Sequence, residues 1–279
     1  MSGTLYVVAT PIGNLDDLTP RARQILGDVD RIAAEDTRHT GRLLTHIGAK
    51  TPQIALHDFN EAEAAAGLVD TILGGSNVAL VSDAGTPLVS DPGYRLVAMA
   101  HEAGIPVVPV PGASAVTAAL SVAGLATDRF CFEGFLPAKA GARKRRLEAL
   151  AAEPRTLVFF ESVHRMADSL AAMAAAFGPD RPATLARELT KLYESVTRST
   201  LGELAAGHED GSLVSRGEFV VVVGGAGEAE AAPTVDTDRL LAALVEVLPG
   251  KQAAHIVARL TGEARNDVYR RMLEIKESE

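Results

Sequence analysis

Short apolar runs alternate with longer amphipathic segments over the first 125 residues of the chain. Runs of four or five apolar residues are typical of buried strands, whereas the longer segments repeat their apolar positions at helical spacing. Strands are predicted at residues 5–9, 31–34, 53–56, 77–81 and 107–110, and helices at residues 19–26, 36–47, 60–73, 91–104 and 114–123. This β-α-β-α order predicts an α/β domain with a largely parallel sheet over residues 1–125.

Residues with special backbone or capping properties mark the ends of two of these helices. Asn60 is predicted to cap the third helix with its side chain. Pro92 is predicted to occupy the first position of the fourth helix, where its missing N–H costs nothing, and Gly104 to end it.

A second set of elements follows, with hairpin-like as well as crossover connections. Strands are predicted at residues 129–135, 156–160, 183–186, 194–200 and 218–223, and helices at residues 142–152 and 165–177. The mixture predicts a second domain of α+β character over residues 126–224. Small and acidic residues then predict a flexible linker over residues 225–236. Three short helices, at residues 237–247, 251–260 and 266–275, are expected to form a helical tail module over residues 237–279.

Composition and charge narrow the class of protein. Of the 279 residues, 47% are hydrophobic and 23% charged, as in ordinary globular proteins. The single cysteine, Cys131, excludes an internal disulfide and fits a cytoplasmic protein, and with dispersed histidines it leaves no metal site to expect. The net charge of −9 argues against a protein that coats nucleic acid non-specifically.

The uncharged stretch 106–127 is interrupted by proline and glycine, so a buried strand and helix are favoured over a membrane span.

Three predicted strand ends are rich in glycine, proline and polar residues: residues 10–14, 34–39 and 82–87. Ligands of open α/β sheets bind outside the carboxyl ends of the strands, and glycine lets a backbone approach them closely. One such loop is most often only a tight turn, but three at one sheet edge favour a ligand pocket. The glycine patterns of dinucleotide folds and P-loops are absent from the sequence, so neither site is supported.

Five basic residues and no acidic residue occupy residues 139–146. They are Lys139, Arg143, Lys144, Arg145 and Arg146. Such a run is as often a solvated helix face as a binding site. In an acidic protein, concentrated positive charge after a strand-end turn is also typical of contacts with a few phosphates, so RNA binding is the second interpretation.

Several motifs follow one another in a known order along residues 4–224. They are LYVVATPIGNL from Leu5, AEDTRHT from Ala34, VSDAGTP from Val81, SDPG from Ser90, VPGASA from Val110, FEGFLP from Phe132, ESVHR from Glu161 and ARELTK from Ala186. Together they resemble the ribosomal RNA small subunit methyltransferase I family of the tetrapyrrole methylase superfamily. One departure is Val163, where the family usually has proline, and it concerns turn geometry.

The resemblance implies a fold, an activity and a set of contacts. Two α/β domains are expected to hold S-adenosylmethionine in the cleft between them, and the protein to be a homodimer. The implied reaction is 2′-O-methylation of a cytidine ribose in the decoding region of 16S rRNA within the small ribosomal subunit. Carried over by motif, the cofactor contacts are Pro11, Ala84, Gly85, Thr86, Val89, Ser114, Ala115, Glu161 and Leu189.

A ribose hydroxyl is a weak nucleophile at neutral pH, so a proton acceptor is expected near it. Asp36 is our candidate for this role, with Arg38 positioning phosphate or ribose. The alternative, that Asp36 caps the following helix and pairs with Arg38, has equal weight.

Two rival functions stay open on the sequence. A small-molecule, tetrapyrrole-type methylase would need neither the basic segment nor the helical tail. A non-catalytic ribosome-assembly factor would tolerate a damaged cofactor loop, whereas Pro11 and residues 84–87 look intact and favour an enzyme.

Overall fold

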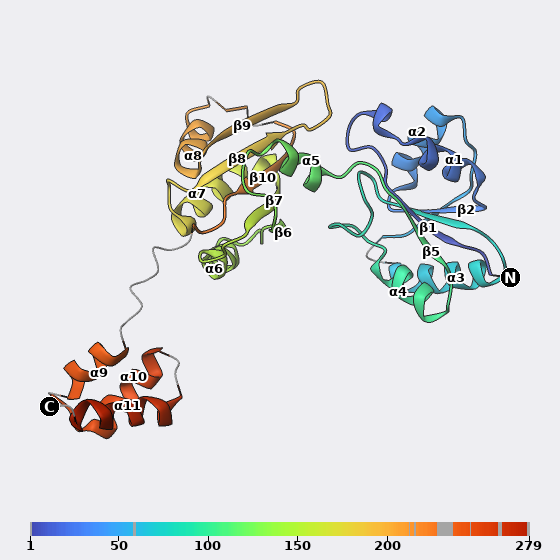
Figure 1. Cartoon of the computed structure of the whole chain (residues 1–279). Coiled ribbons are helices and arrows are strands. Elements are labelled where there is room, and N and C mark those ends of the chain that lie inside the picture. The colour runs from blue at the N-terminus through green and yellow to red at the C-terminus, as the bar shows by residue number, and fades with distance from the viewer. Residues whose placement is uncertain are drawn as a thin grey trace. The chain divides into compact units, whose positions relative to one another are not determined.

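The computed structural model describes residues 2–57, 60–211, 213–214, 216–227, 237–245, 247–261 and 264–277. The chain forms two compact units, residues 1–226 and 227–279, each of which has its own core (Figure 1). Of the predicted linker, residues 228–236 lie outside the described residues.

The first sheet is fully parallel, as predicted, and its strand order is β3-β2-β4-β1-β5. Its strands are β1 (Leu5–Val8), β2 (Arg31–Ala34), β3 (Gln53–Ala55), β4 (Val78–Val81) and β5 (Val107–Val110). The connecting helices are η1 (Leu15–Asp17), α1 (Pro20–Asp28), α2 (Thr37–Ile47), α3 (Glu61–Leu73), α4 (Tyr94–Glu102) and α5 (Ala115–Val122). Each predicted helix and strand of this part is present, with ends that differ by up to three residues.

Both faces of this sheet are buried, because successive side chains of a strand point to opposite faces. In β4, Val78 and Leu80 pack with α3 and α4, whereas Ala79 and Val81 pack with α1 and α2. The continuous apolar runs of the sequence therefore reflect helices on both faces.

The start of α4 differs from the prediction. The helix begins at Tyr94, and Pro92 precedes it instead of occupying its first position. Gly93 is the residue at the helix boundary, with a φ of 120°, and a Cβ there would lie 2.8 Å from a methyl group of Leu80. The close packing on β4 therefore places glycine at the boundary.

Asn60 stands at the cap position of α3, but its side chain does not cap the helix. Its Oδ1 instead accepts a hydrogen bond from the backbone N–H of His57, and its Nδ2 donates to the carbonyl of Ala55. Asn60 thus stabilises the turn that leads into the helix.

The second sheet is mixed, with the order β6-β7-β10-β8-β9, and only β6 and β7 are parallel. Its strands are β6 (Phe130–Phe135), β7 (Thr156–Ser162), β8 (Pro182–Arg187), β9 (Ser195–Thr200) and β10 (Glu218–Val223). Its helices are α6 (Ala140–Leu150), η2 (Val163–Arg165), α7 (Met166–Phe177) and α8 (Leu201–Glu209). The α+β mixture expected from the sequence is present.

Helices cover this sheet from both sides. Leu147 of α6, Leu170 of α7 and Leu204 of α8 belong to the core on one face. On the other face, α5 packs against β7, β8 and β10, with Val116 and Leu120 in the same core. The helix that follows the last strand of the first sheet thus packs on the second sheet.

The helix α8 is absent from the sequence-based prediction. Two glycines, Gly202 and Gly207, weaken its helical pattern. A signal is nevertheless present in the sequence, because Thr200 and Glu203 form a reciprocal capping box at its start.

The second unit consists, within the described residues, of three helices, α9 (Thr237–Val245), α10 (Gly250–Thr261) and α11 (Arg265–Glu277). Leu241, Val257 and Met272 form its small core, one from each helix. In the part of the chain that the structure describes, no helix has both the length and the apolar character needed to cross a membrane.

Candidate functional site

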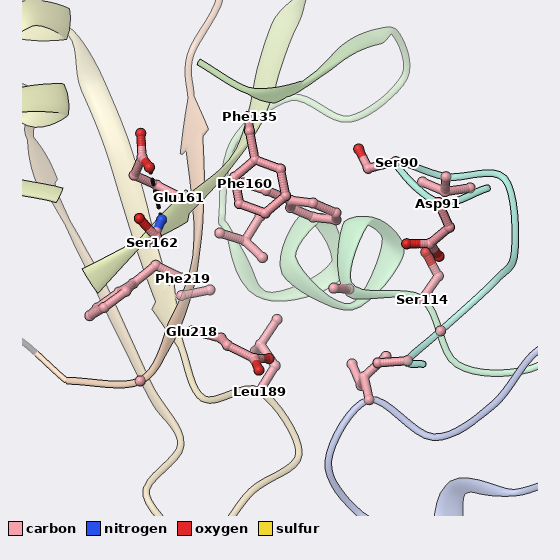
Figure 2. A pocket seen from close by; sticks show the side chains of 18 of the residues that line it. Ser90, Asp91, Ser114, Phe135, Phe160, Glu161, Ser162, Leu189, Glu218 and Phe219 are labelled. Carbon is pink, nitrogen blue, oxygen red and sulfur yellow. Dashed lines mark hydrogen bonds between the residues drawn. The ribbon is translucent and has the colours of Figure 1, made fainter. Parts of the chain in front are cut away.

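A cavity of about 400 Å³ lies where the carboxyl end of the first sheet meets the second sheet. The loop after β4 and the start of α5 line it from the first sheet. The opposite wall comes from the ends of β6, β7 and β8 and the start of β10. Figure 2 shows Ser90, Asp91 and Ser114 on one side of this cavity, and Phe135 and Phe160 on the other.

Eight of the nine predicted cofactor contacts line the cavity. They are Ala84, Gly85, Thr86, Val89, Ser114, Ala115, Glu161 and Leu189. The ninth, Pro11, lies in a neighbouring pocket, and its successor Ile12 reaches the main cavity instead. Residues distant in the sequence thus converge on one cavity, but a role in cofactor binding stays a prediction for each of them.

Several lining residues lie outside the set predicted from the sequence. They are Ile12, Ser90, Asp91, Phe135, Phe160, Ser162, Val163, Ala186, Gly217, Glu218, Phe219 and Val220. Most belong to the motifs that carry the family resemblance or adjoin them. The start of β10 carries no signal in the sequence, because its apolar run reads only as a buried strand.

Two glycine-containing loops form the floor of the cavity. Thr10 and Gly85 exchange backbone hydrogen bonds of 2.9 and 3.1 Å, which fastens the loop after β1 to the loop after β4. Gly85 has a φ of 87°, and a Cβ there would lie 3.3 Å from Ile12 Cγ2. The Thr86 hydroxyl donates to the carbonyl of Ala113 and ties the loop to the segment before α5.

Backbone strain is concentrated around this cavity. Four non-glycine residues of the described chain have positive φ, at Leu88, Ser90, Glu188 and Thr190. The first two lie in the loop before α4 and the others in the loop after β8, and these loops face the cavity from opposite sides. Such strain persists where the surroundings over-determine a conformation, and it is common at ligand sites.

Glu161 is a buried carboxylate with several hydrogen-bond partners. It accepts a hydrogen bond from the backbone N–H of its neighbour Ser162 at 2.8 Å (Figure 2). It also accepts one from the Ser169 hydroxyl at 2.6 Å. Arg165 Nε lies 3.2 Å from its Oε1. These contacts fix the carboxylate at the end of β7, beside the cavity.

Asp91 has a different environment. Burial raises the pKa of its carboxyl to about 6; the nearby Ser82 hydroxyl lowers it in part, and the carboxylates of Glu35 and Asp83 raise it. Asp91 therefore titrates close to neutral pH, on the wall of the cavity.

Asp36 and Arg38 adopt the alternative that the sequence left open. The Asp36 carboxylate accepts the backbone N–H of Arg38 at 2.8 Å and caps α2, and Arg38 Nη2 lies 2.6 Å from its Oδ2. The Arg38 guanidinium holds the pKa of Asp36 well below its usual range. A carboxylate with so low a pKa is a weak proton acceptor, and neither residue lines the main cavity.

A second pocket of about 270 Å³ adjoins the first. It is lined by Thr10, Pro11, Gly13, Leu15, His39, Thr40, Arg42, Leu43, Ser82 and Asp83. The loops after β1 and β4 contribute to both pockets, so they form a shared wall. The exposed side chains of His39 and Arg42 give this second pocket a basic rim.

Lys191, in the loop after β8, contacts the loop after β1. Its aliphatic chain lies against Gly13, where an added Cβ would come within 2.4 Å of Lys191 Cγ. Its ammonium group is 3.0 Å from Glu188 Oε1 and 3.1 Å from Glu218 Oε2. Glycine at position 13 thus lets the Lys191 side chain approach the backbone of the loop after β1 closely.

The basic segment 139–146 divides into two sets of residues. Arg143 is 7% exposed and pairs with Asp168 at 3.3 Å, so it faces the protein and not the solvent. Its burial differs from our expectation of a phosphate contact, because α6 turns this position toward the core beside Leu147.

The other four basic residues are exposed. Arg146 pairs with the largely buried carboxylate of Glu133, and Lys144 lies 3.8 Å from Glu148. Lys139, Lys144 and Arg145 therefore remain the best candidates for contact with RNA.

The cavity suits a nucleoside joined to a charged amino acid. Its volume falls in the range of small-molecule sites, about 300–1,000 Å³. Phe135 and Phe160 meet edge to face at 5.6 Å and provide an apolar wall. The acidic residues of the lining suit a cationic ligand. These residues fit S-adenosylmethionine.

Among the described residues, no group of three or more His, Cys, Asp and Glu side chains is placed to hold a metal ion.

Sequence comparisons agree with this geometry. The family model of tetrapyrrole (corrin/porphyrin) methylases matches residues 4–205, and that of the RsmI C-terminal HTH domain matches residues 231–276. The chain is 51% identical over 275 residues to ribosomal RNA small subunit methyltransferase I of Pseudomonas aeruginosa, covering 98% of both chains. It is 51% identical over 272 residues to the protein of that name from Escherichia coli O157:H7, covering 98% of this chain and 95% of the other.

Solved structures share the fold at lower sequence identity. The uroporphyrin-III-C-methyltransferase of Thermus thermophilus superposes with a TM-score of 0.55 at 23% identity, covering 80% of this chain and 94% of that one. A diphthine synthase gives a TM-score of 0.58 at 14% identity, covering 80% of this chain and 90% of that one. Fold, motifs and near-complete alignment with the curated relatives lead to one conclusion. The chain belongs to the ribosomal RNA small subunit methyltransferase I family of the tetrapyrrole methylases.

Proposed function

We propose that this chain transfers a methyl group from S-adenosylmethionine to the ribose 2′-hydroxyl of a cytidine in the decoding region of 16S rRNA. Methylation of small-subunit rRNA with this cofactor follows from the family; the ribose oxygen and the cytidine are the finer part of the proposal. The observation that supports it best is a cofactor-sized cavity lined by eight of the nine family contact positions.

The cofactor supplies an already activated methyl group, so alignment accounts for much of the catalysis. The strained loops around Ser90 and Thr190 hold the cavity walls in fixed positions. Phe135 and Phe160 give the cavity an apolar side. The Glu161 side chain is fully buried, and its carboxylate is held by Ser169 and Arg165 at the end of β7.

The second pocket is our proposal for the RNA side of the reaction. It shares a wall with the cofactor cavity, so a nucleotide there lies beside the methyl donor. Arg42 at its rim provides positive charge, and His39 a ring nitrogen for hydrogen bonding, to backbone phosphates, which position a strand without reading its sequence.

The rival functions have less support. A tetrapyrrole methylase would share the fold, but the uroporphyrin-III-C-methyltransferase structure is only 23% identical to this chain. A non-catalytic assembly factor would not need eight contact positions to converge on one cavity. Action on ribosomal RNA also implies a cytoplasmic location.

We also propose a homodimer, as the family resemblance implies. Leu192 and Tyr193 are 88% and 68% exposed and lie beside the edge strand β9. Large exposed apolar side chains near an unpaired strand edge are typical of a protein interface.

The decisive experiment is nucleoside mass spectrometry of 16S rRNA from a strain that lacks this gene. We expect the loss of one 2′-O-methylcytidine, restored by the wild-type gene. Ribose and base methylation give different fragments, so the measurement identifies the modified atom. An unchanged 2′-O-methylcytidine content, or loss of a base methylation instead, would contradict the proposal.

A further inference from the structure

Three carboxyl groups line the cofactor cavity among the described residues: Asp91, Glu161 and Glu218. Glu161 is buried and held by Arg165 and Ser169. The Glu218 side chain is 80% exposed and lies 3.1 Å from the Lys191 ammonium group. Of these three described carboxyl groups, Asp91 alone faces no basic side chain.

The groups that face Asp91 are all acidic or neutral. Glu35 and Asp83 follow the ends of β2 and β4, and Ser82 precedes Asp83. The backbone holds Asp91 in place, because Ser90 before it has a φ of 70° and the proline after it has a fixed φ. Within the described chain, Asp91 is therefore a carboxyl group without a counter-ion, set on the cavity wall opposite the two phenylalanines (Figure 2).

We propose that Asp91 is the catalytic residue that removes the proton from the attacking ribose hydroxyl. Asp91 accepts the O2′ proton on a carboxylate oxygen while the O2′–methyl bond forms and the methyl–sulfur bond breaks, its electron pair staying on sulfur. The proton then leaves Asp91 for solvent. This assignment rests on the proposed methylation of a ribose oxygen.

The environment of Asp91 suits this role better than that of Asp36. A general base works best when its pKa is near the working pH. Burial raises the pKa of Asp91 to about 6, whereas the Arg38 guanidinium lowers that of Asp36. Asp36 also caps α2 and does not line the cavity.

The test compares Asp91→Asn with Asp36→Asn in single-turnover methylation of small subunits at saturating cofactor, across a range of pH on both sides of neutrality. Asparagine keeps the shape of aspartate but cannot accept the proton. We expect Asp91→Asn to lower the rate by about 100-fold or more. The wild-type rate should fall below about pH 6, and the variant should lose this fall. Asp91→Glu should restore part of the rate. The rate of Asp36→Asn should still fall at acidic pH.

Two measurements without turnover accompany the rates. Calorimetry should show S-adenosylmethionine binding to Asp91→Asn within about threefold of the wild type. Thermal unfolding of the ligand-free protein should show the raised pKa directly. Because the folded pKa of Asp91 exceeds the unfolded value, its stabilising contribution is complete below about pH 4 and is lost as pH rises through about 6. Asp91→Asn should therefore gain stability relative to the wild type between these values.

Each contrary result has a distinct meaning. Wild-type rates in Asp91→Asn overturn the role of Asp91 and leave the proposed function intact. Loss of cofactor binding by more than about tenfold shows that Asp91 binds the cofactor, which also overturns it. If Asp36→Asn loses the fall in rate at acidic pH, the role of proton acceptor belongs to Asp36. Absence of ribose methylation by the wild-type enzyme overturns the proposed function, and this assignment with it.

Discussion

At the scale of single residues, the cavity depends on backbone conformations that most side chains disfavour. Gly85 combines a φ of 87° with a close neighbour, Ile12, on the cavity floor. Leu88 and Ser90 adopt positive φ a few residues later, although they are not glycine. The loop after β4 is therefore held in one shape by its contacts, and its ligand meets a preformed surface.

Replacement of Gly85 by valine should abolish S-adenosylmethionine binding while the fold is retained. The new β-branched side chain would have an unfavourable φ and would press on Ile12. Gly48→Val is the matched control, since Gly48 has a φ of 74° but open space around it, at the end of α2. Both variants should lose about 1–3 kcal/mol of stability. Calorimetry and circular dichroism check the outcome; undiminished affinity in Gly85→Val would refute the placement of the cofactor.

At the scale of elements, helix α6 shows how one basic segment divides between two faces of a helix. Its positions 143, 147 and 150 are buried at helical spacing, so Arg143 falls on the core face with two leucines. Lys144 and Arg145 fall on the solvent face. A run of basic residues in the sequence does not by itself show which of them face the core. The packing of the helix against the rest of the protein decides this.

Removal of positive charge from the solvent face should weaken RNA binding alone. A variant with Lys139, Lys144 and Arg145 changed to alanine should keep its stability and cofactor affinity but methylate small subunits slowly. Because each phosphate contact releases counterions, removal of three such contacts should reduce the slope of log K against log salt by about 2 to 3. Full activity on subunits would mean that these residues form only a solvated face.

The control for this variant is Arg143→Ala. It removes one buried guanidinium and its contact with Asp168, so it should reduce the free energy of unfolding by about 1–2 kcal/mol. The salt dependence of RNA binding should not change. A flatter salt dependence in Arg143→Ala would show instead that this residue reaches a phosphate.

At the scale of the whole molecule, charge and composition point to a folded substrate. The chain has a net charge of −9, no tryptophan and 4% aromatic residues, so it lacks the broad basic surface and stacking residues that hold single strands. Of the exposed basic groups, we expect those on α6 and at the rim of the second pocket to contact phosphates. Such a surface binds well only where phosphates are already fixed in space.

Purified small subunits should therefore be methylated much faster than protein-free 16S rRNA. The measurement is the initial rate of methyl incorporation on both substrates at one magnesium and salt concentration. Cofactor affinity, measured without RNA, provides the control that the enzyme is equally active in both assays. Equal rates on the two substrates would contradict the requirement for an assembled particle.

The sequence by itself determined the elements of the parallel first sheet, in order, and the loops that line the cavity. These features are local: apolar periodicity reports which positions are buried, and glycine and proline mark turns. Even so, the pattern wrongly places Pro92 inside α4, and it misses α8 because Gly202 and Gly207 hide a helix that tertiary packing and a capping box stabilise.

Only the tertiary structure decided which chemical groups act together. Asp36 and Asp91 both follow strands of one sheet, but one meets a guanidinium and the other meets two carboxylates and a cavity. Likewise, Arg143 and Arg145 are two positions apart in a basic run, yet one is buried and the other exposed. Neighbours distant in the chain set the pKa of a side chain, and a run of like charges does not show which of its members face the core.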